Sequence, residues 1–274
     1  RGAEFSRSVN ELVIEANQLV DNGSKEITLL GQNVNAYNYN KKKLSDLILE
    51  ISKIKDLKRI RYTTSHPRDF SKDLIELHKD CEKLMPLIHL PVQSGSNKIL
   101  KNMNRKHTIE EYMDIIENLR KSNPNIELSS DFIIGYPGET DYDFEQTIKL
   151  MKKIKFINSY SFIFSARPGT PAFNLKKIDE NIAKERLIDF QNVSKKIKTE
   201  YRQTLLAKTM PVLFENKTKD GNKYFGRDSH FNSVIVNSND NLAGEIKDIK
   251  ITELNQNTLF GEINSKIIKE DFAA

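Results

Sequence analysis

The stretch Ser129–Asp141, with the sequence SSDFIIGYPGETD, decides the fold. Its apolar run at residues 132–134 is typical of a parallel strand that is covered on both faces. Gly135 ends the run, residues 137–138 turn the chain, and the Thr-Asp pair that closes the stretch can cap a following helix. Ligands of parallel α/β folds bind at the carboxyl ends of strands, where this turn lies. The stretch therefore indicates either a ligand-binding turn or a tight strand-to-helix connection without a ligand.

On both sides of this stretch, strand-like and helix-like patterns alternate. Short apolar runs typical of strands lie at residues 26–30, 59–62, 87–90, 132–134 and 159–164. Apolar residues at helical spacing cover residues 8–20, 44–54, 71–78, 108–121 and 142–154. Thr108 and Glu111 have the spacing of a capping box at the start of one predicted helix. The alternation predicts an α/β fold with a parallel sheet and right-handed crossovers.

Each predicted strand is followed by a polar segment. These segments are GQN at 31–33, TSHP at 64–67, PVQSGS at 91–96, GYPGET at 135–140 and SARPGT at 165–170. On a barrel or half-barrel, segments at the carboxyl ends of parallel strands line one mouth. We therefore expect an active site at this mouth, against the alternative that the five segments are polar by coincidence.

A basic helical segment follows the last of these strands. Residues 179–206 have a mostly helical pattern, and the span from Lys176 to Lys208 holds nine basic and five acidic residues. A local excess of positive charge favours a polyanionic partner such as nucleic acid. A solvated helix face is the alternative interpretation.

The pattern changes after this segment to short β-type runs. They lie at residues 211–215, 223–226, 233–236, 242–251 and 260–263, with polar turns between them. Several short strands in about 60 residues predict a small closed β-barrel of the OB-like kind, and such barrels often bind nucleic acid. A structural cap is the alternative. We predict two domains, residues 1–205 and residues 206–268.

Composition limits the class of protein. The chain has 274 residues, 38% hydrophobic and 30% charged, with a formal net charge of +5. No apolar run reaches the ~20 residues that a membrane-spanning helix needs, so we expect a soluble, cytoplasmic protein without a membrane partner. Cys81 is the one cysteine in the sequence, so the chain can form neither an internal disulfide nor a cysteine metal cluster. Because the sequence opens on Arg1 in a loop-like segment, we expect a fragment that lacks its amino-terminal part.

The sequence motifs at the strand ends resemble those of a known protein family. RGAEFSR, LLGQNVNAY, RYTTSHP, HLPVQSGS, DFIIGYPGET and FIFSARPGTPA occur in the order found in the radical S-adenosylmethionine (SAM) methylthiotransferases. Residues 224–227 and 232–234 resemble the TRAM domain of the same family, a small RNA-binding β-barrel. The resemblance implies a partial (βα)6 TIM-like radical SAM barrel whose first strand is missing, followed by an all-β, OB-like TRAM barrel. It also implies that the cysteines of both 4Fe–4S clusters lie outside this chain and that Cys81 is structural.

The resemblance assigns cofactor-binding residues to the mouth of the barrel. Gly31, Gln32 and Asn33 stand where radical SAM barrels carry a Gly-Gly-Glu-like motif that binds the methionine moiety of SAM. The amide side chains at these positions can hold amino and carboxylate groups. The other cofactor- or substrate-binding positions implied are Ser65, His66, Gln93, Asp131, Gly135 and Arg167. His66 precedes a proline and can instead simply cap its strand, and we assign neither a catalytic residue nor a metal ligand within the chain.

The function that the resemblance implies is tRNA methylthiolation. A 5′-deoxyadenosyl radical made from SAM would remove hydrogen from C2 of an isopentenylated adenosine beside the anticodon, and a methylthio group would be added there. The full-length protein would need SAM, two 4Fe–4S clusters and an external electron donor, and the fragment itself would be inactive. The anticodon stem-loop would contact the basic helix and the TRAM barrel through Lys195, Lys196, Lys198, Arg202 and Arg227.

Two alternatives stay open. The first is a sibling methylthiotransferase that acts on threonylcarbamoyladenosine or on an aspartate of a ribosomal protein. The second is a non-catalytic RNA-binding protein that keeps a degenerate barrel.

Overall fold

The computed structural model describes residues 5–63, 65–219 and 221–264. The opening residues RGAE, and the predicted turn positions Thr64 and Asp220, lie outside these ranges. The chain forms two compact units, Arg1–Lys198 and Thr199–Ala274. In the described part of the chain, no helix combines the length and the apolar character that crossing a membrane requires.

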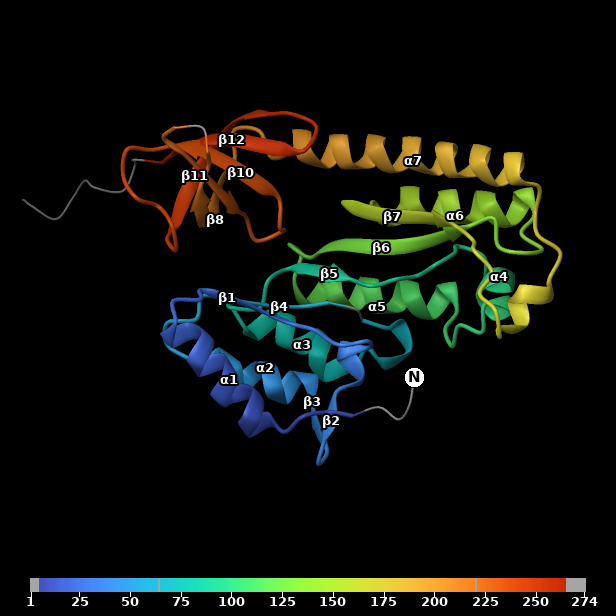
Figure 1. Cartoon of the computed structure of the whole chain (residues 1–274), viewed down its shortest axis with the longest axis horizontal. Helices are drawn as coiled ribbons and strands as arrows, with labels where there is room; N and C mark the ends of the chain where they lie inside the picture. Colours follow the sequence, from blue (N-terminus) through green and yellow to red (C-terminus); the bar gives the residue numbers. More distant parts are fainter. Residues whose placement is uncertain (1–4, 64, 220, 265–274) are drawn as a thin grey trace, which may run out of the picture. The chain divides into compact units, whose positions relative to one another are not determined.

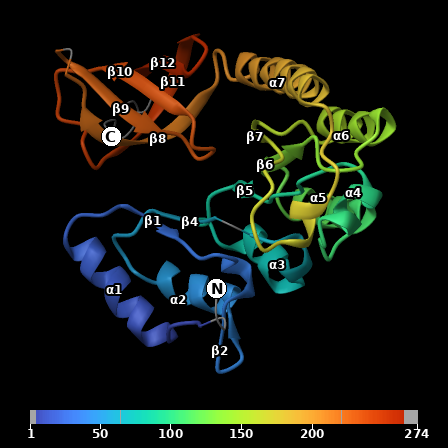
Figure 2. The same cartoon turned by 45° about the vertical axis from the view of Figure 1, so that its right-hand side comes forward.

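The first unit is built on five parallel strands. They are β1 (Glu26–Leu29), β4 (Arg59–Tyr62), β5 (Leu87–His89), β6 (Glu127–Ile134) and β7 (Asn158–Ile163). β1 pairs with β4 in one ladder, and β5, β6 and β7 pair in another. A parallel bridge links Ile60 of β4 to Leu84, three residues before β5, and within each ladder the strand order follows the sequence order. The prediction of a parallel α/β fold is confirmed, and Figure 2 shows the strands in an arc with helices along its outer side.

The helices of this unit start near the predicted positions. They are α1 (Val9–Asp21), α2 (Leu44–Ser52), α3 (Lys72–Asp80), α5 (Ile109–Ser122) and α6 (Asp141–Ile154), and α7 (Glu180–Gln203) begins in this unit and ends in the second (Figure 1). The predicted capping box at Thr108 and Glu111 is present, with the side chain of each residue accepting from the backbone N–H of the other. Thr140 and Asp143 form a second box at the start of α6. Both boxes satisfy backbone donors that would otherwise have no partner in the first turn.

Short elements escaped the sequence analysis. They are the strands β2 (Asn38–Tyr39) and β3 (Lys42–Lys43), the helix α4 (Asn97–Asn102), and the 3₁₀ turns Val34–Ala36, Pro67–Asp69 and Pro171–Asn174. The β2–β3 hairpin turns at Asn40 and Lys41, which both have positive φ angles. Two such residues suit a type I′ turn, but a lysine at the second position hides the usual Asn-Gly signal.

Side-chain alternation along β6 divides the sheet into a core face and an inner face. Phe132 points to the core, where its ring packs 5.5 Å from Phe156 and 4.7 Å from Phe190 of α7. Asp131 and Ile133 point to the opposite face, because neighbouring residues of a strand alternate in direction. Polar side chains on the inner face are therefore free of the apolar core.

The second unit contains a closed five-stranded barrel, as predicted. Its strands are β8 (Thr209–Lys217), β9 (Lys223–Arg227), β10 (Ser233–Asn237), β11 (Ile246–Leu254) and β12 (Thr258–Ile263), in the order β10-β12-β11-β8-β9. A Cβ atom on Gly226 would lie 2.5 Å from the Leu213 carbonyl oxygen, and one on Gly261 would lie 2.5 Å from Ile249 Cγ2. Both glycines are therefore needed for the strands to approach closely.

The stability of the first unit should depend on pH through His78 of α3. Its Nε2 lies 2.7 Å from the Tyr62 hydroxyl, Nδ1 has no partner among the described residues, and burial lowers the pKa of the imidazole to about 4. Below the ordinary histidine pKa of about 6.5, the unfolded chain binds a proton that the folded chain does not, so the free energy of unfolding falls. From pH 7.5 to pH 5, His78 should remove about 2 kcal/mol.

Urea unfolding of the wild type and of His78→Gln at these two pH values measures this contribution. The variant should lose less stability on acidification than the wild type does. An equal loss in both proteins would contradict the assignment.

Candidate functional site

Two strand ends are tied together by the loop after β1. The Asn35 side chain donates to the His66 carbonyl oxygen at 2.9 Å and accepts from the His66 backbone N–H at 2.8 Å. Asn33 Nδ2 donates to Asp69 Oδ2 at 2.6 Å. These three hydrogen bonds hold the GQN segment beside the segment that follows β4, as expected for neighbouring segments of one mouth.

Two polar atoms at this junction are buried without a partner. Asn33 Oδ1 and Ser65 Oγ form no hydrogen bond within the described part of the chain. A buried polar atom without a partner carries an energetic penalty, which a bound ligand can relieve. The amide oxygen and the hydroxyl could both form hydrogen bonds with a polar ligand, and both belong to residues predicted to bind the cofactor.

Two histidines meet beyond this junction, and both favour the neutral form. The rings of His66 and His107 are in edge contact, with their centroids 5.6 Å apart. Burial first, and then the charge of Arg105, lowers the pKa of His66. Burial, His66 and Arg105 lower the pKa of His107 to about 4, although the Val92 backbone acts in the opposite direction.

Arg105 supplies positive charge to this part of the mouth and was missed by the sequence analysis. Burial lowers the pKa of its guanidinium, whereas the charge of Asp131 acts to raise it. Among the described residues, none forms a hydrogen bond or an ion pair that occupies this guanidinium. A partly buried guanidinium whose N–H groups have no protein acceptor is suited to bind two oxygens of an anion, such as a carboxylate or a phosphate. Arg105 lies in the turn after α4, next to Asn104, whose φ is positive. The sequence signal that could have identified this residue is an arginine close to the predicted polar segment 91–96.

Gln93 is held in an unusual conformation at the end of β5. It is buried, and its φ of 74° lies in the left-handed region that non-glycine residues seldom adopt. Its backbone N–H donates to the Asp131 carbonyl oxygen, and its own carbonyl accepts from Ile133 N–H, both at 3.0 Å. Such strain is often found at functional sites, and here the sheet hydrogen bonds hold it in place.

Asp131 faces the inner side of the sheet next to His89. Its Oδ1 lies 3.5 Å from His89 Nε2, and His89 Nδ1 lies 2.9 Å from Ser129 Oγ. Electrostatic interaction with Arg105 connects Asp131 to the histidine pair. The structure therefore brings together Asn33, Ser65, His66, Gln93 and Asp131 of the predicted set, and adds Arg105 and His107.

Packing within the protein explains why residue 135 is a glycine. Its φ is 72°, and a Cβ atom at this position would lie 2.9 Å from the Cβ of Ala183 on α7. Its N–H donates to Glu139 Oε1 at 3.1 Å, and the same oxygen accepts from Arg186 Nη1 at 2.9 Å. The glycine allows α7 to pack against the turn, so contact with a bound cofactor or substrate is not required to explain it.

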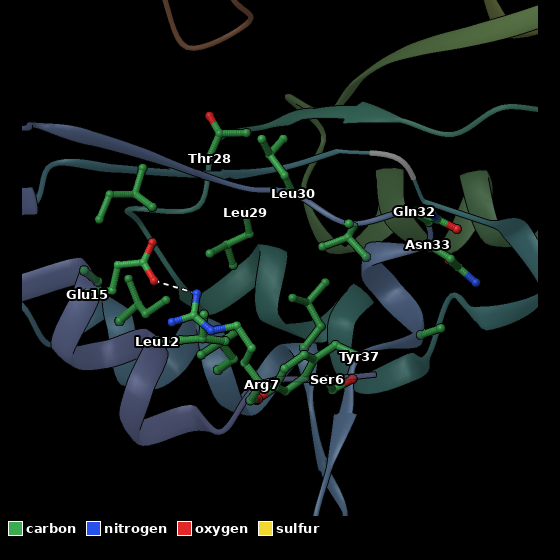
Figure 3. A pocket seen from close by; sticks show the side chains of 18 of the residues that line it. Ser6, Arg7, Leu12, Glu15, Thr28, Leu29, Leu30, Gln32, Asn33 and Tyr37 are labelled. Carbon is green, nitrogen blue, oxygen red and sulfur yellow. Dashed lines mark hydrogen bonds and ion pairs between the residues drawn. The ribbon is translucent and has the colours of Figure 1, made fainter. Parts of the chain in front are cut away.

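Arg167 and Gln32 are exposed, and no contact connects them to the cluster in the described structure. The Arg167 carbonyl accepts from Thr170 in a surface turn that follows β7. Gln32 lies instead at a cavity of about 610 Å³ between α1, α2 and β1. Figure 3 shows Gln32 and Asn33 on one side of this cavity and the Arg7–Glu15 ion pair on the other, with aliphatic side chains between them.

The residues predicted to bind RNA differ in accessibility. Lys195 and Lys196 are exposed on α7, and Lys198 is partly buried. Arg202 is only 3% exposed, and its Nη1 donates to the Gln256 carbonyl oxygen at 3.3 Å. Arg202 belongs to the second unit and packs there against the barrel, and its assignment to RNA binding stays a prediction. Helical spacing placed it on the basic strip, but its helix face is covered.

Arg227 lies in an aromatic environment on the second unit. Its guanidinium carbon lies 4.1 Å from the centroid of Phe231 and 5.1 Å from that of Phe225. Its Nε also donates to Glu215 Oε1 at 3.0 Å. The ion pair and the stacking contacts fix the guanidinium at the surface, where it can contact a phosphate or a base.

The described residues contain no cluster of three or more histidine, cysteine or acidic side chains that could hold a metal ion. Cys81 is free and partly buried at the end of α3. A cysteine-ligated cluster therefore does not fit the residues of this chain alone.

Comparison with known families gives two matches. The model of the Radical SAM superfamily matches residues 1–151, and the model of the TRAM domain matches residues 203–263.

The curated relatives are identical to this chain at about half of the aligned positions. The tRNA-2-methylthio-N(6)-dimethylallyladenosine synthase of Pelagibacter ubique is 52% identical over 98% of this chain and 61% of its own length. The protein of the same name from Wolbachia pipientis of Culex pipiens is 52% identical over 95% of this chain and 61% of its own length. The chain thus spans about 61% of the length of these relatives.

Solved structures share the fold at low sequence identity. Coproporphyrinogen III oxidase from Escherichia coli, described as a radical SAM enzyme, has a TM-score of 0.52 at 12% identity, over 82% of this chain and 61% of its own. Methylornithine synthase has a TM-score of 0.51 at 12% identity, over 72% of this chain and 56% of its own.

Gly135 offers a test of the packing at this turn. Gly135→Ala forces a positive φ on alanine and pushes its Cβ into Ala183, so it should cost more stability than Gly138→Ala. Gly138 is the matched control, because its φ of 81° gives a similar backbone strain with no atom within 4 Å of the added Cβ. Overpacking should make the difference about 1–3 kcal/mol in chemical unfolding. Equal losses would show that Ala183 moves aside without cost.

Proposed function

The chain belongs to the radical SAM superfamily, and from that membership we propose that it acts in tRNA methylthiolation, with an isopentenylated adenosine beside the anticodon as substrate. The observation that carries this proposal is the similarity, at about half identity over nearly the whole chain, to relatives named for that product. The TRAM match to the second unit supports an RNA substrate. A tRNA substrate also favours a cytoplasmic location.

The mouth fits SAM as the cofactor. Asn33 Oδ1 and Ser65 Oγ are buried and unpartnered in the described structure, and they match a ligand that carries an ammonium and hydroxyl groups. Arg105 offers a planar donor for the carboxylate of an amino-acid moiety. Once reduced by one electron from a 4Fe–4S cluster, bound SAM would supply a carbon radical that removes hydrogen from an unreactive position.

The residues of the chain orient the ligand and control charge around it. The lowered pKa values keep His66 and His107 neutral at neutral pH, so positive charge in this part of the mouth is concentrated on Arg105. The Asn35 clamp fixes the loop that carries Asn33, and the strained backbone of Gln93 fixes its direction. The protein thereby supplies binding and orientation, as expected where a cofactor carries the chemistry.

The iron–sulfur part of the reaction is not supplied by these residues. The sequence has one cysteine, and no metal-ligating group of three occurs in the described ranges. A 4Fe–4S cluster would need thiolates from outside these 274 residues, together with an external electron donor. The second candidate, a non-catalytic RNA-binding protein with a degenerate barrel, would be preferred only if the native gene encoded these 274 residues alone.

RNA binding should depend on the exposed lysines of α7. Lys195→Gln with Lys196→Gln should weaken binding of an anticodon stem-loop. The slope of log affinity against log salt should become shallower by about 1–2, because a protein that makes fewer phosphate contacts releases fewer counterions from the RNA. Lys53→Gln with Lys149→Gln is the matched control, because these lysines are exposed on the first unit in local ion pairs. Fluorescence anisotropy at several salt concentrations measures both effects. An affinity of the wild type that does not change with salt would contradict the proposed grip.

The product decides between the candidate functions. The whole native gene that includes this coding sequence, expressed in bacteria that lack 2-methylthio-isopentenyladenosine, should restore this nucleoside in tRNA, as measured by mass spectrometry. Methylthiolated threonylcarbamoyladenosine or a modified ribosomal protein would instead identify a sibling enzyme. Unchanged tRNA, despite retained RNA binding, would favour the non-catalytic binder.

A further inference from the structure

β7 presents two large aromatic side chains to solvent from the inner face of the sheet. Tyr160 is 54% exposed and Phe162 is 59% exposed. In the parallel register of β6 and β7, Asp131 is opposite Tyr160 and Ile133 is opposite Phe162. All four side chains therefore point to the inner face, away from Phe132 and the helices.

The two rings are spaced as a base-stacking surface requires. Residues two apart on a strand are separated by about 6.6 Å, which leaves room for one planar ring between or across two aromatic side chains. Open sheet surfaces with exposed aromatic residues bind unpaired bases of RNA by stacking in this way.

Polar groups beside the rings match the edge of a purine. The Tyr160 ring lies in edge contact with His89, with their centroids 6.0 Å apart, and His89 in turn lies next to Asp131. The Asp131 side chain is about one-third exposed, so its carboxylate can accept a hydrogen bond from an amino N–H of a ligand. Ile133 adds an apolar surface next to Phe162, suited to an aliphatic substituent on that amino group.

We infer that Tyr160 and Phe162 form the stacking platform for the target adenine, with its N6–H directed to Asp131 and its five-carbon substituent packed against Ile133. This inference rests on the proposed function, because it names the part of the mouth that receives the substrate base. The platform adjoins the Gln93 and Arg105 side of the cluster, since β6 carries Asp131 and bonds to Gln93.

The test uses a synthetic anticodon stem-loop RNA that carries 2-aminopurine at the position of the modified adenosine. This base lacks an N6 group, so it tests the stacking by Tyr160 and Phe162 and not the contacts with Asp131 and Ile133. Stacking on an aromatic ring quenches 2-aminopurine emission, so fluorescence reports the platform and anisotropy of a terminal dye reports binding as a whole. The wild type should bind the RNA and quench the emission. Tyr160→Ala with Phe162→Ala should abolish the quenching and weaken binding about tenfold.

Two variants serve as controls. Tyr160→Phe keeps the ring and should retain quenching and affinity. Tyr142→Ala removes an aromatic side chain that is also exposed but lies on helix α6, and it should change neither signal. Thermal unfolding should show that all variants remain folded, because the altered side chains are exposed.

The outcomes separate this inference from the function on which it rests. RNA binding by the wild type without quenching, or equal binding and quenching by the double alanine variant, would overturn the platform and leave the proposed function standing. No RNA binding by the wild type would reject the proposed function and the platform together. Quenching by the platform combined with a different modified nucleoside in the product assay would retain the platform and reject the substrate.

Discussion

The parallel direction of the five strands is the constraint on which the site depends. Within the two ladders β1–β4 and β5–β6–β7, neighbouring strands run in the same direction, so each connection between them must return along the outer side as a helix. All carboxyl ends then face one way, and loops far apart in the sequence come within reach of each other. The contact between Asn35 and His66 and the charge interaction between Arg105 and Asp131 are consequences of this arrangement. A ligand site needs no single motif when the topology collects its parts.

Most of this arrangement could be predicted from the sequence, because the positions of strands, helices and polar strand ends depend on residues that are close together in the chain. Apolar runs, capping boxes and glycine turns depend on neighbouring residues, and most observed strands and helices begin near the expected positions, although β6 begins at Glu127, five residues before the predicted run, and β11 at Ile246, four residues after. The position of a side chain relative to a distant element does not follow local rules. Arg105 lies in a short turn after an unpredicted helix, and only the fold shows that its charge meets Asp131.

Two further differences have the same physical origin. Gly135 was interpreted as a close approach to a ligand, but the atom that limits it is the Cβ of Ala183, 48 positions later in the sequence. Arg202 has the charge and helical spacing of a surface residue, but the barrel of the second unit covers it. Residue type and periodicity describe what a side chain can do, whereas packing by distant segments decides which surface it meets. The assignments of Gln32 and Arg167 remain predictions for the same reason.

The charge distribution of the mouth follows from burial more than from the number of basic groups. Two imidazoles lie near one guanidinium, and a low-dielectric environment makes it unfavourable to place three positive charges so close together. Burial, and then the charge of Arg105, lowers the pKa of both His66 and His107, while Arg105 keeps its charge because its intrinsic pKa is far higher. The neutral rings therefore add no positive charge beside Arg105, whose guanidinium is the group on this side that suits a carboxylate or phosphate. Selectivity at this side of the mouth thus arises because the same burial suppresses the charge of histidine but not that of arginine.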